Sequence, residues 1–464
     1  MSDALKLAPQ TDSAVARTAS TRMNGRIFFW SLTSALAGFL FGFDTVVISG
    51  AEKTIQTLWA LSPGVHGIAM ASALYGTVVG SLIGGWPADR FGRKATLLWI
   101  GVLYFVGAVG SALATNVAMF IAARVIGGLG IGISTVVAPM YISEIAPPKH
   151  RGRLAGMFQF NIVFGILIAF VSNALLAGIG PNAWRWMLGV AAFPSALYAL
   201  FCFGLPESPR WLLSRKGDRA AALQILQRTE PDLSAAEIAA QADEIAAASA
   251  SEQLATGHFW TRRLSKPILL AILIAFFNQM SGINAILYFA PRIFELTGLA
   301  AKAALLQSVG IGITNLVFTF VGLWLIDKLG RRTLLYIGSF GYITSLGLVA
   351  WAFFTQHFSI VPVCIFGFIA AHAVGQGAVI WVFISEIFPN RHRAEGQTLG
   401  SFTHWIFAAA LTTFFPKMVA AFPPGYVFSF FTGMMVLQLI WVATMVPETK
   451  GIPLEQIQRQ LGIE

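Results

Sequence analysis

The sequence predicts an all-α membrane protein in which twelve transmembrane helices form two six-helix bundles with a cytoplasmic helical insert. The chain has 464 residues, of which 56% are hydrophobic and only 11% are charged, whereas soluble domains carry about 25% charged residues. A membrane-spanning helix needs about 20 apolar residues, and hydropathy gives twelve such runs. They fall into two sets of six on either side of the only long polar segment, so we expect two bundles.

The predicted elements follow from this hydropathy profile. The spans of the first bundle lie at 27–50, 66–86, 95–115, 118–140, 155–178 and 185–205, and those of the second at 267–290, 304–326, 333–354, 359–384, 397–416 and 425–446. The predicted domains are a cytoplasmic N-terminal tail (1–26), the first bundle (27–206), a cytoplasmic helical linker (207–266), the second bundle (267–447) and a cytoplasmic C-terminal segment (448–464). No short apolar core with a cleavage site precedes the first span, so we expect no removable signal peptide.

The basic residues indicate the orientation. They gather in alternate loops, whereas the intervening loops hold few; the basic loops contain Arg90, Arg93 and Lys94, then Lys149, Arg151 and Arg153, then Lys328, Arg331 and Arg332, then Arg391 and Arg393. The positive-inside rule places both termini and the insert in the cytoplasm, as an even number of spans requires. The net charge of +10 is therefore a topology signal in a multi-pass protein of the cell's inner (plasma) membrane. It adds some attraction to anionic lipid headgroups and does not indicate nucleic-acid binding.

The two halves repeat three short motifs in the same order. Residues 89–94 (DRFGRK) match 327–332 (DKLGRR), residues 142–147 (ISEIAP) match 384–389 (ISEIFP), and residues 206–208 (PES) match 447–449 (PET). Two six-span repeats related by an axis along the membrane normal suit a transporter whose halves rock about a central site. The alternative is that these loops are only tight turns, with Gly92 and Gly330 serving turn geometry. That alternative explains each loop but not their matching order.

The insert at 207–266 is predicted to be helical and structural. Asp218 can cap a helix that runs through Arg228, and Ser234 with Glu237 forms a capping box before an alanine-rich helix that ends near Ser251. We expect the insert to tie the halves together or to brace the cytoplasmic side, since it contains no catalytic cluster.

Asp44 is the only charged residue between positions 27 and 50. A carboxylate in hydrocarbon is costly, so it normally faces the bundle interior and has a partner. Arg124, in the fourth span, always carries its charge and is the candidate partner. Weakening such a pair would raise the pKa of Asp44, so the pair can couple proton uptake to a conformational change. The alternative, a permanent structural ion pair, stays open.

The seventh span is unusually polar. Asn278, Ser281 and Asn284 recur at about one helical turn and are predicted to share a face. Such side chains either hold helices together or bind the hydroxyl groups of a neutral polyol. Further amides and two tryptophans that can stack on a sugar ring lie elsewhere: Gln159, Asn161, Asn315, Trp381 and Trp405.

Several function classes are excluded by the residues. The chain shows no acid pair, metal-ligand spacing or nucleophile–base set, so we expect neither an enzyme nor a metal site nor a cofactor. No phosphate-binding loop is present, which argues against ATP-driven pumping. Gly127, Gly128, Gly130 and Gly132 lie within a span, where small residues allow close helix packing. Cys202 and Cys364 both lie in predicted spans and suggest no disulfide.

Six ordered segments resemble the sugar porter family of the major facilitator superfamily, over nearly the whole chain from about Phe41 to Ile457. The segments are residues 42–50 (GFDTVVISG), 89–94 (DRFGRK), 206–211 (PESPRW), 279–284 (QMSGIN), 327–332 (DKLGRR) and 447–451 (PETKG). The resemblance implies two six-helix bundles with a cytoplasmic helical domain, and transport of a monosaccharide by alternating access. It also implies that Asp44 and Arg124 form the proton-coupling pair, and that facilitative animal members lack the acid found at Asp44.

The resemblance implies two further sets of residues. The family's sugar site maps onto Phe41, Gln159, Gln279, Asn284, Tyr288, Asn315, Gly377 and Trp381, and Asn278, His404 and Trp405 border it. The cytoplasmic gating network maps onto Asp89, Arg93, Glu144, Arg153, Glu207, Asp327, Arg331, Glu386, Arg393 and Glu448. The chain departs from the family at Asn278, at Phe289, where a tyrosine is common, and at His404, where asparagine or glutamine is frequent. These departures leave the preferred sugar open.

We therefore expect proton-coupled symport of a monosaccharide, a hexose or a pentose, into the cell by alternating access. The expected partners are the sugar, the proton and the lipid bilayer, and one chain is expected to act as a monomer. Two alternatives remain at this point. One is a facilitative uniporter in which Asp44 is structural, and the other is a non-transporting sugar sensor, which the short C-terminal segment disfavours.

Overall fold

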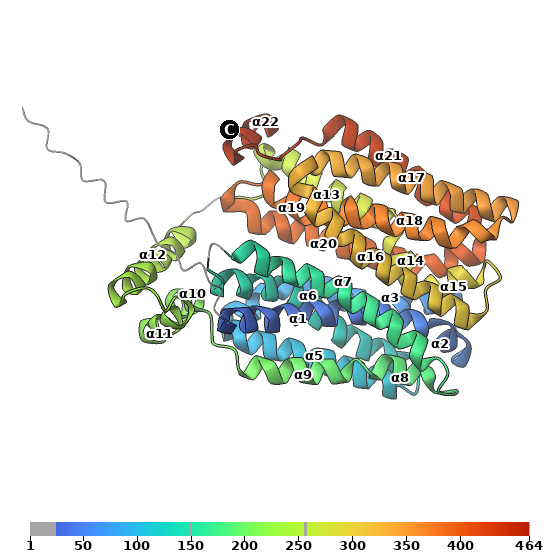
Figure 1. The fold of residues 1–464 in the computed structure, drawn as a ribbon, viewed down its shortest axis with the longest axis horizontal. Helices are drawn as coiled ribbons and strands as arrows, with labels where there is room; N and C mark the ends of the chain where they lie inside the picture. The colour runs from blue at the N-terminus through green and yellow to red at the C-terminus, as the bar shows by residue number, and fades with distance from the viewer. Residues whose placement is uncertain (1–24, 148–149, 255–257, 464) are drawn as a thin grey trace, which may run out of the picture.

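The computed structural model describes residues 25–147, 150–254 and 258–463, and within them it contains helices and no strand (Figure 1). The predicted N-terminal tail at 1–26 lies almost wholly outside the described residues. Eleven helical segments of the described chain are long and apolar enough to cross a membrane. A twelfth long helix, α20 (Arg393–Ala421), is less apolar and is not among them. The predicted all-α, twelve-helix fold class is confirmed.

The first half contains six long helical segments. They are α1 (Gly25–Val47), α3 (Pro63–Ile83), α5 (Arg93–Leu113), α6 (Val117–Ile145), α7 (Arg151–Leu176), and the pair α8 (Ala183–Gly189) and α9 (Ala192–Phe203). The 3₁₀ turn η1 (Ile48–Gly50) and two short helices, α2 (Glu52–Leu58) and α4 (Gly85–Phe91), connect them. Gly128 shows why the glycine run of α6 is needed, since a Cβ there would lie 1.9 Å from the carbonyl oxygen of Ala73 on α3. The predicted packing role of these glycines is thereby confirmed.

The second half contains the remaining segments. They are α13 (Ser265–Met280), α14 (Ile283–Tyr288), α15 (Ala290–Glu295), α16 (Ala301–Leu329), α17 (Arg331–Thr355), α18 (Val361–Val374), α19 (Gln376–Ile387), α20, α21 (Pro424–Met445) and the terminal α22 (Leu454–Leu461). Two predicted spans are broken here, one at Gly282 and the other at Gly375. Gly282 has φ +87°, a left-handed conformation that favours glycine.

The break at Gly282 corrects one prediction. Asn278 and Asn284 do not lie on one continuous helix face, because the helix stops after Met280 and restarts at Ile283. Ser281 lies in the break, where its hydroxyl donates to the carbonyl oxygen of Asn278 at 2.6 Å. Ser281 therefore satisfies the backbone at the break.

The halves lie side by side and have two distinct ends (Figure 1). The insert helices α10 (Pro209–Trp211), α11 (Arg219–Thr229) and α12 (Ala235–Leu254) lie at one end, here named the insert end. Helices α2, α8 and α15 lie at the opposite end, here named the far end. Between the halves, α3 packs along α20 and α7 packs along α16.

The insert folds as its capping residues predict. Asp218 accepts a hydrogen bond from the Ala221 amide at 3.0 Å and so caps α11. Before α12, the Glu237 carboxylate accepts from the Ser234 amide at 2.8 Å, and the Ser234 hydroxyl accepts from the Glu237 amide at 3.3 Å. This is the predicted capping box. Helix α12 ends at Leu254, slightly beyond the predicted end near Ser251.

Candidate functional site

A buried ion pair joins two helices in the interior of the first half. The Nη1 atom of Arg124 on α6 donates to Oδ1 of Asp44 on α1 at 2.7 Å, and its Nη2 atom donates to the Asp44 carbonyl oxygen at 3.1 Å. The side chains are 3% and 8% exposed, respectively. A charge this deeply buried must be paired, because removing one partner leaves the other uncompensated. The predicted side-chain pairing is therefore present in the structure.

Each member of this pair retains one unused polar atom. Oδ2 of Asp44 and Nε of Arg124 are buried and have no hydrogen-bond partner among the described residues. Oδ2 is thus an open acceptor, while Oδ1 is held by the guanidinium. The hydroxyl of Tyr288 on α14 is also buried without a described partner. Helix α14 contacts α1, so the second half packs against the helix that carries Asp44.

Gln279 is the centre of a polar cluster in the second half. Its Nε2 atom donates to Oδ1 of Asn278 at 2.9 Å and to the His404 ring, where Nε2 lies at 3.1 Å. Its Oε1 atom accepts from Nδ2 of Asn284 at 2.7 Å. Because the helix is broken at Gly282, Asn284 on α14 can turn back towards Gln279 on α13. The cluster therefore offers donors and acceptors at neighbouring positions.

Aromatic rings adjoin this polar cluster. The His404 ring lies between Trp381 of α19 and Trp405 of α20, with centroid separations of 5.3 Å and 4.7 Å. Trp405 in turn meets Phe41 of α1 edge-on at 5.4 Å, so this contact crosses between the halves. Amide groups beside flat apolar faces form the kind of surface that binds a small polar ligand, and a neutral polyol fits this combination.

The structure does not bring every predicted sugar-site residue into this cluster. Among the described residues, no hydrogen bond joins Gln159 on α7, Asn315 on α16 or Gly377 on α19 to this cluster. Gly377 packs instead on His372, since a Cβ there would lie 3.0 Å from the His372 carbonyl oxygen. His372 itself hydrogen-bonds to the Tyr342 hydroxyl at 2.7 Å, a buried pair that the sequence analysis did not identify.

The insert end carries the same charged cluster in each half. In the first half, Nε and Nη2 of Arg93 each bind a Glu144 oxygen at 2.9 Å, and Nη1 contacts Asp89 at 3.1 Å. In the second half, the matching atoms of Arg331 bind the Glu386 oxygens at 3.0 and 2.7 Å, and Nη1 contacts Asp327 at 3.3 Å. These clusters reproduce the sequence repeat in three dimensions.

A second carboxylate completes each cluster by binding backbone amides. Glu207 accepts from the amides of Arg93, Lys94 and Ser208, and Glu448 accepts from those of Arg331, Arg332, Thr449 and Lys450. Burial raises the pKa of Glu207 despite its amide donors. Burial also acts to raise the pKa of Glu448, but there the four backbone amides outweigh it and the pKa lies below its usual value. Gly92 and Gly330 both have φ +93° beside these carboxylates, so the two glycines do serve turn geometry, as the alternative reading of these loops required, within clusters that also match between the halves.

Arg153 and Arg393 have no ion pair to any carboxylate of the described residues. Arg153 is exposed, and Nε of Arg393 donates to the Ser385 carbonyl oxygen at 2.9 Å. At the insert end, the ion pairs of the described residues shown here lie within one half, lie within the insert, or attach the insert to the first half, as Arg215 does through Asp89 at 2.9 Å. Their predicted role as a gate therefore stays a prediction.

The far end is closed by contacts that the sequence analysis did not predict. Glu52 of α2 binds both His66 of α3 and Arg292 of α15, and exposed Lys53 pairs with Glu295. From the sequence, these basic residues belong only to the loops that hold few charges, because nothing local indicates that Glu52 and Arg292, 240 residues apart, meet. The only indication in the sequence was that these residues lie next to span ends on the same side of the membrane.

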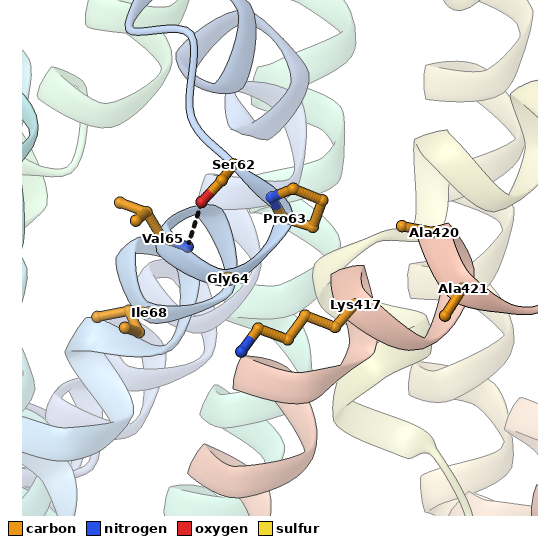
Figure 2. A pocket seen from close by; sticks show the side chains of 8 residues that line it. All are labelled: Ser62, Pro63, Gly64, Val65, Ile68, Lys417, Ala420 and Ala421. Atoms are coloured by element: carbon orange, nitrogen blue, oxygen red, sulfur yellow. Dashed lines mark hydrogen bonds between the residues drawn. The ribbon is translucent and has the colours of Figure 1, made fainter.

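Helices α3 and α20 also meet closely at the far end. A Cβ at Gly67 would lie 1.9 Å from the Thr413 carbonyl oxygen, and the Tyr75 hydroxyl bonds to that of Thr413 at 2.5 Å. Figure 2 shows the mouth of this seam, where the Lys417 side chain extends from α20 towards Gly64 at the start of α3. The seam is therefore tightly packed below a shallow surface pocket.

Comparisons with known proteins agree on one family. Residues 30–461 match the family model "Sugar (and other) transporter". The arabinose-proton symporter of Bacillus subtilis is 36% identical over 94% of this chain and 95% of its own. The glucose transporter GlcP of Staphylococcus epidermidis is 35% identical over 93% of this chain and 96% of its own. A solved structure, the partially occluded inward open conformation of the xylose transporter XylE from E. coli, matches with a TM-score of 0.83 and 31% identity over 93% of this chain and 100% of that one. This chain is therefore an integral membrane protein and not an enzyme, and it belongs to the sugar porter family of the major facilitator superfamily.

Proposed function

We propose that this protein imports a monosaccharide, a hexose or a pentose, together with a proton, by alternating access. The observation that carries the proposal is the buried pair of Asp44 and Arg124, in which one carboxylate oxygen is bound and the other is unpartnered. Relatives whose names include proton symport of arabinose and transport of glucose support both the coupling and the substrate class.

The proton step is assigned to Asp44. When the carboxylate is ionised, Arg124 neutralises it and binds α1 to α6. When Oδ2 takes a proton, the charge attraction is lost and the guanidinium keeps only neutral acceptors, so the pair weakens. Protonation thus changes how firmly α1 is held, which is the differential interaction that a coupled conformational change requires.

The sugar step is assigned to the cluster around Gln279. The amides of Gln279 and Asn284 and the His404 ring bind hydroxyl groups, while Trp381 and Trp405 supply apolar faces. We include the other predicted sugar-site residues in this proposal, since Gln159, Asn315 and Gly377 lie on helices α7, α16 and α19 of the same two bundles.

A route between the two sites runs along α1. Phe41 lies three residues before Asp44, on the same side of the helix, and its ring contacts Trp405 of the sugar cluster. A movement of α1 when Asp44 changes its charge therefore reaches the sugar site directly. Tyr288 belongs to the second half of this route, because it lies on α14, which contacts α1.

The orientation and state also form part of the proposal. We assign the insert end to the cytoplasm because the basic loops gather there, and the far end to the outside. The described ion pairs between halves lie at the far end, which supports an inward-facing state. Because one chain contains both halves, a monomer is sufficient for transport.

The test is Asp44→Asn, measured in proteoliposomes. Asparagine keeps an oxygen that accepts from Arg124 but cannot ionise, so we expect sugar accumulation driven by a proton gradient to be lost while sugar exchange persists. Asp243→Asn is the matched control, because Asp243 is an exposed acid of the insert that pairs with Arg219, another exposed residue of the insert.

The outcomes separate the candidates. Undiminished accumulation in Asp44→Asn would overturn proton coupling through this residue. Sugar exchange without gradient-driven accumulation in the unaltered protein would favour the uniporter, with Asp44 structural. Absence of any sugar flux would favour a sensor.

A further inference from the structure

We propose that Glu52, His66 and Arg292 form a latch that holds the far end closed, and that His66 is the residue that positions the Glu52 carboxylate for Arg292. These three residues are named the far-end latch. The inference rests on the proposed alternating-access function, since a latch has meaning only if the far end also opens. It assigns a gating role to residues outside the charged loop motifs.

The geometry of Glu52 carries the proposal. Its Oε1 atom accepts from Nε of Arg292 at 2.8 Å, and its Oε2 atom accepts from Nε2 of His66 at 2.8 Å. The Glu52 side chain is 2% exposed and the His66 side chain is fully buried. A buried carboxylate is tolerated only when its oxygens are hydrogen-bonded and its charge is paired. Both oxygens are used here, one within the first half and the other across to the second half.

The two partners of Glu52 have different roles. His66 belongs to α3 of the same half as Glu52, so it fixes the carboxylate without joining the halves. Arg292 belongs to α15 of the other half, and its Nη2 atom also binds the Gln56 side chain on α2. Arg292 therefore contacts two residues of one helix across the interface. Removing His66 would leave Glu52 free to rotate away, which loosens the contact indirectly.

The far-end latch is also joined to the sugar cluster. Phe289 directly follows Tyr288 and precedes α15, and its ring meets the His66 ring at 6.1 Å and the Phe415 ring at 5.0 Å. The segment from Asn284 to Arg292 thus carries a sugar-site amide at one end and the latch arginine at the other. A ligand that repositions α14 also repositions Arg292, so occupancy of the cluster and closure of the latch are mechanically connected.

The neighbouring pair of Lys53 and Glu295 provides a built-in comparison. It joins the same two helices, α2 and α15, but the Lys53 side chain is 65% exposed. Exposed ion pairs contribute little, because water and salt screen them. If any ion pair at the far end held it closed, removing either pair would open it. If the latch holds it closed, only removal of the buried pair opens it.

The test measures opening of the far end directly. Thr413→Cys on α20 serves as a reporter in a chain whose native Cys202 and Cys364 are replaced by alanine, because Thr413 lies in the closed seam against α3. The rate of labelling by a membrane-impermeant maleimide added from the far side reports the open population. We expect Glu52→Gln and Arg292→Gln each to raise this rate by about tenfold or more, and Lys53→Gln to leave it unchanged within about twofold.

His66 is tested by a conservative rescue. His66→Phe should raise the labelling rate as Glu52→Gln does. His66→Gln retains a hydrogen-bond donor for Glu52, so its labelling rate should lie close to that of the unaltered protein. The Glu52→Gln, Arg292→Gln double variant should label no faster than Arg292→Gln alone, because the single change already removes the contact between Arg292 and Glu52. Sugar exchange measured in the same samples shows that each variant is folded.

The results distinguish the latch from the proposed function. Unchanged labelling in Arg292→Gln or in Glu52→Gln, or an equal rise in Lys53→Gln, would overturn the latch even if sugar transport is confirmed. If the unaltered protein moves no sugar, the labelling experiment still decides whether these residues hold the far end closed. If Glu52→Gln fails to insert into the membrane, Arg292→Lys replaces it as the test variant. Lysine keeps the positive charge but loses the contact to Gln56, so the labelling rate should rise less than in Arg292→Gln. An unchanged labelling rate in Arg292→Lys would count against the latch.

Discussion

Gly67 offers the most direct test of how the far end closes. It lies on α3 against α20, and a Cβ at this position would stand 1.9 Å from the Thr413 carbonyl oxygen. Real Cβ contacts are essentially never under 3.0 Å, so Gly67→Ala must separate the two backbones by at least 1.1 Å at this point. The obstacle is backbone, which has no side-chain rotation available to relieve it.

The energetic consequence falls on one state only. Overpacking of a close contact costs about 1–3 kcal/mol, which corresponds to a shift of about 5- to 150-fold in a two-state equilibrium. In the proposed cycle α3 and α20 separate at this point when the far end opens, so the cost is absent in that state. Gly67→Ala should therefore raise the population of that state, and a larger side chain such as leucine should raise it further.

The assay is the maleimide labelling of Thr413→Cys, together with sugar exchange. We expect Gly67→Ala to label faster from the far side and to exchange sugar more slowly, because it spends less time open at the insert end. Gly433→Ala on α21 is the matched control, since a Cβ there meets nothing within 4 Å. Labelling and exchange that both match the unaltered protein would refute the claim that this contact closes the far end.

Three further variants test other parts of the structure. Glu448→Gln should lower the thermal midpoint at neutral pH by the equivalent of about 1–2 kcal/mol. Because the amide donors lower the pKa of Glu448, this loss of stability should shrink as the pH falls below 4.5. Glu207→Gln should destabilise the protein less at neutral pH, because burial raises the pKa of the Glu207 carboxyl. His404→Ala removes an acceptor from Gln279 and should weaken sugar binding by about 5- to 150-fold in exchange assays, whereas His404→Asn should retain most of it. Gly282→Ala places a side chain in a left-handed conformation and should lower the thermal midpoint by the equivalent of about 1–2 kcal/mol.

Most of the fold followed from hydropathy, because apolar length and loop charge are local properties of a membrane chain. The helix breaks did not follow from it. Gly282 and Gly375 lie inside spans whose mean hydropathy stays high across the break, so a sliding average cannot detect them. Gly282 also shows why the predicted common face of Asn278 and Asn284 was wrong, since a face exists only along an unbroken helix.

The candidate site was predictable where a single residue violates its surroundings. Asp44 is costly in an apolar span, so it required a partner, and Arg124 was the unpaired cation within the same half. The far-end latch had no such signal. Glu52 and Arg292 lie just outside long apolar runs, where charges are ordinary, and their pairing depends on the arrangement of two halves that the sequence does not specify.

The distribution of charge explains how two bundles can move as bodies in the proposed cycle. At the insert end, Arg93 with Glu144 and Arg331 with Glu386 each link helices of one half, so rocking leaves these pairs intact. At the far end, the pair of Glu52 and Arg292 links the two halves, so rocking must break it. When the far end opens, water solvates the separated Glu52 carboxylate and Arg292 guanidinium. This solvation lowers the free energy needed to break the pair. Interactions within the halves therefore keep each bundle rigid, whereas interactions between them set the balance of states that a sugar and a proton then shift.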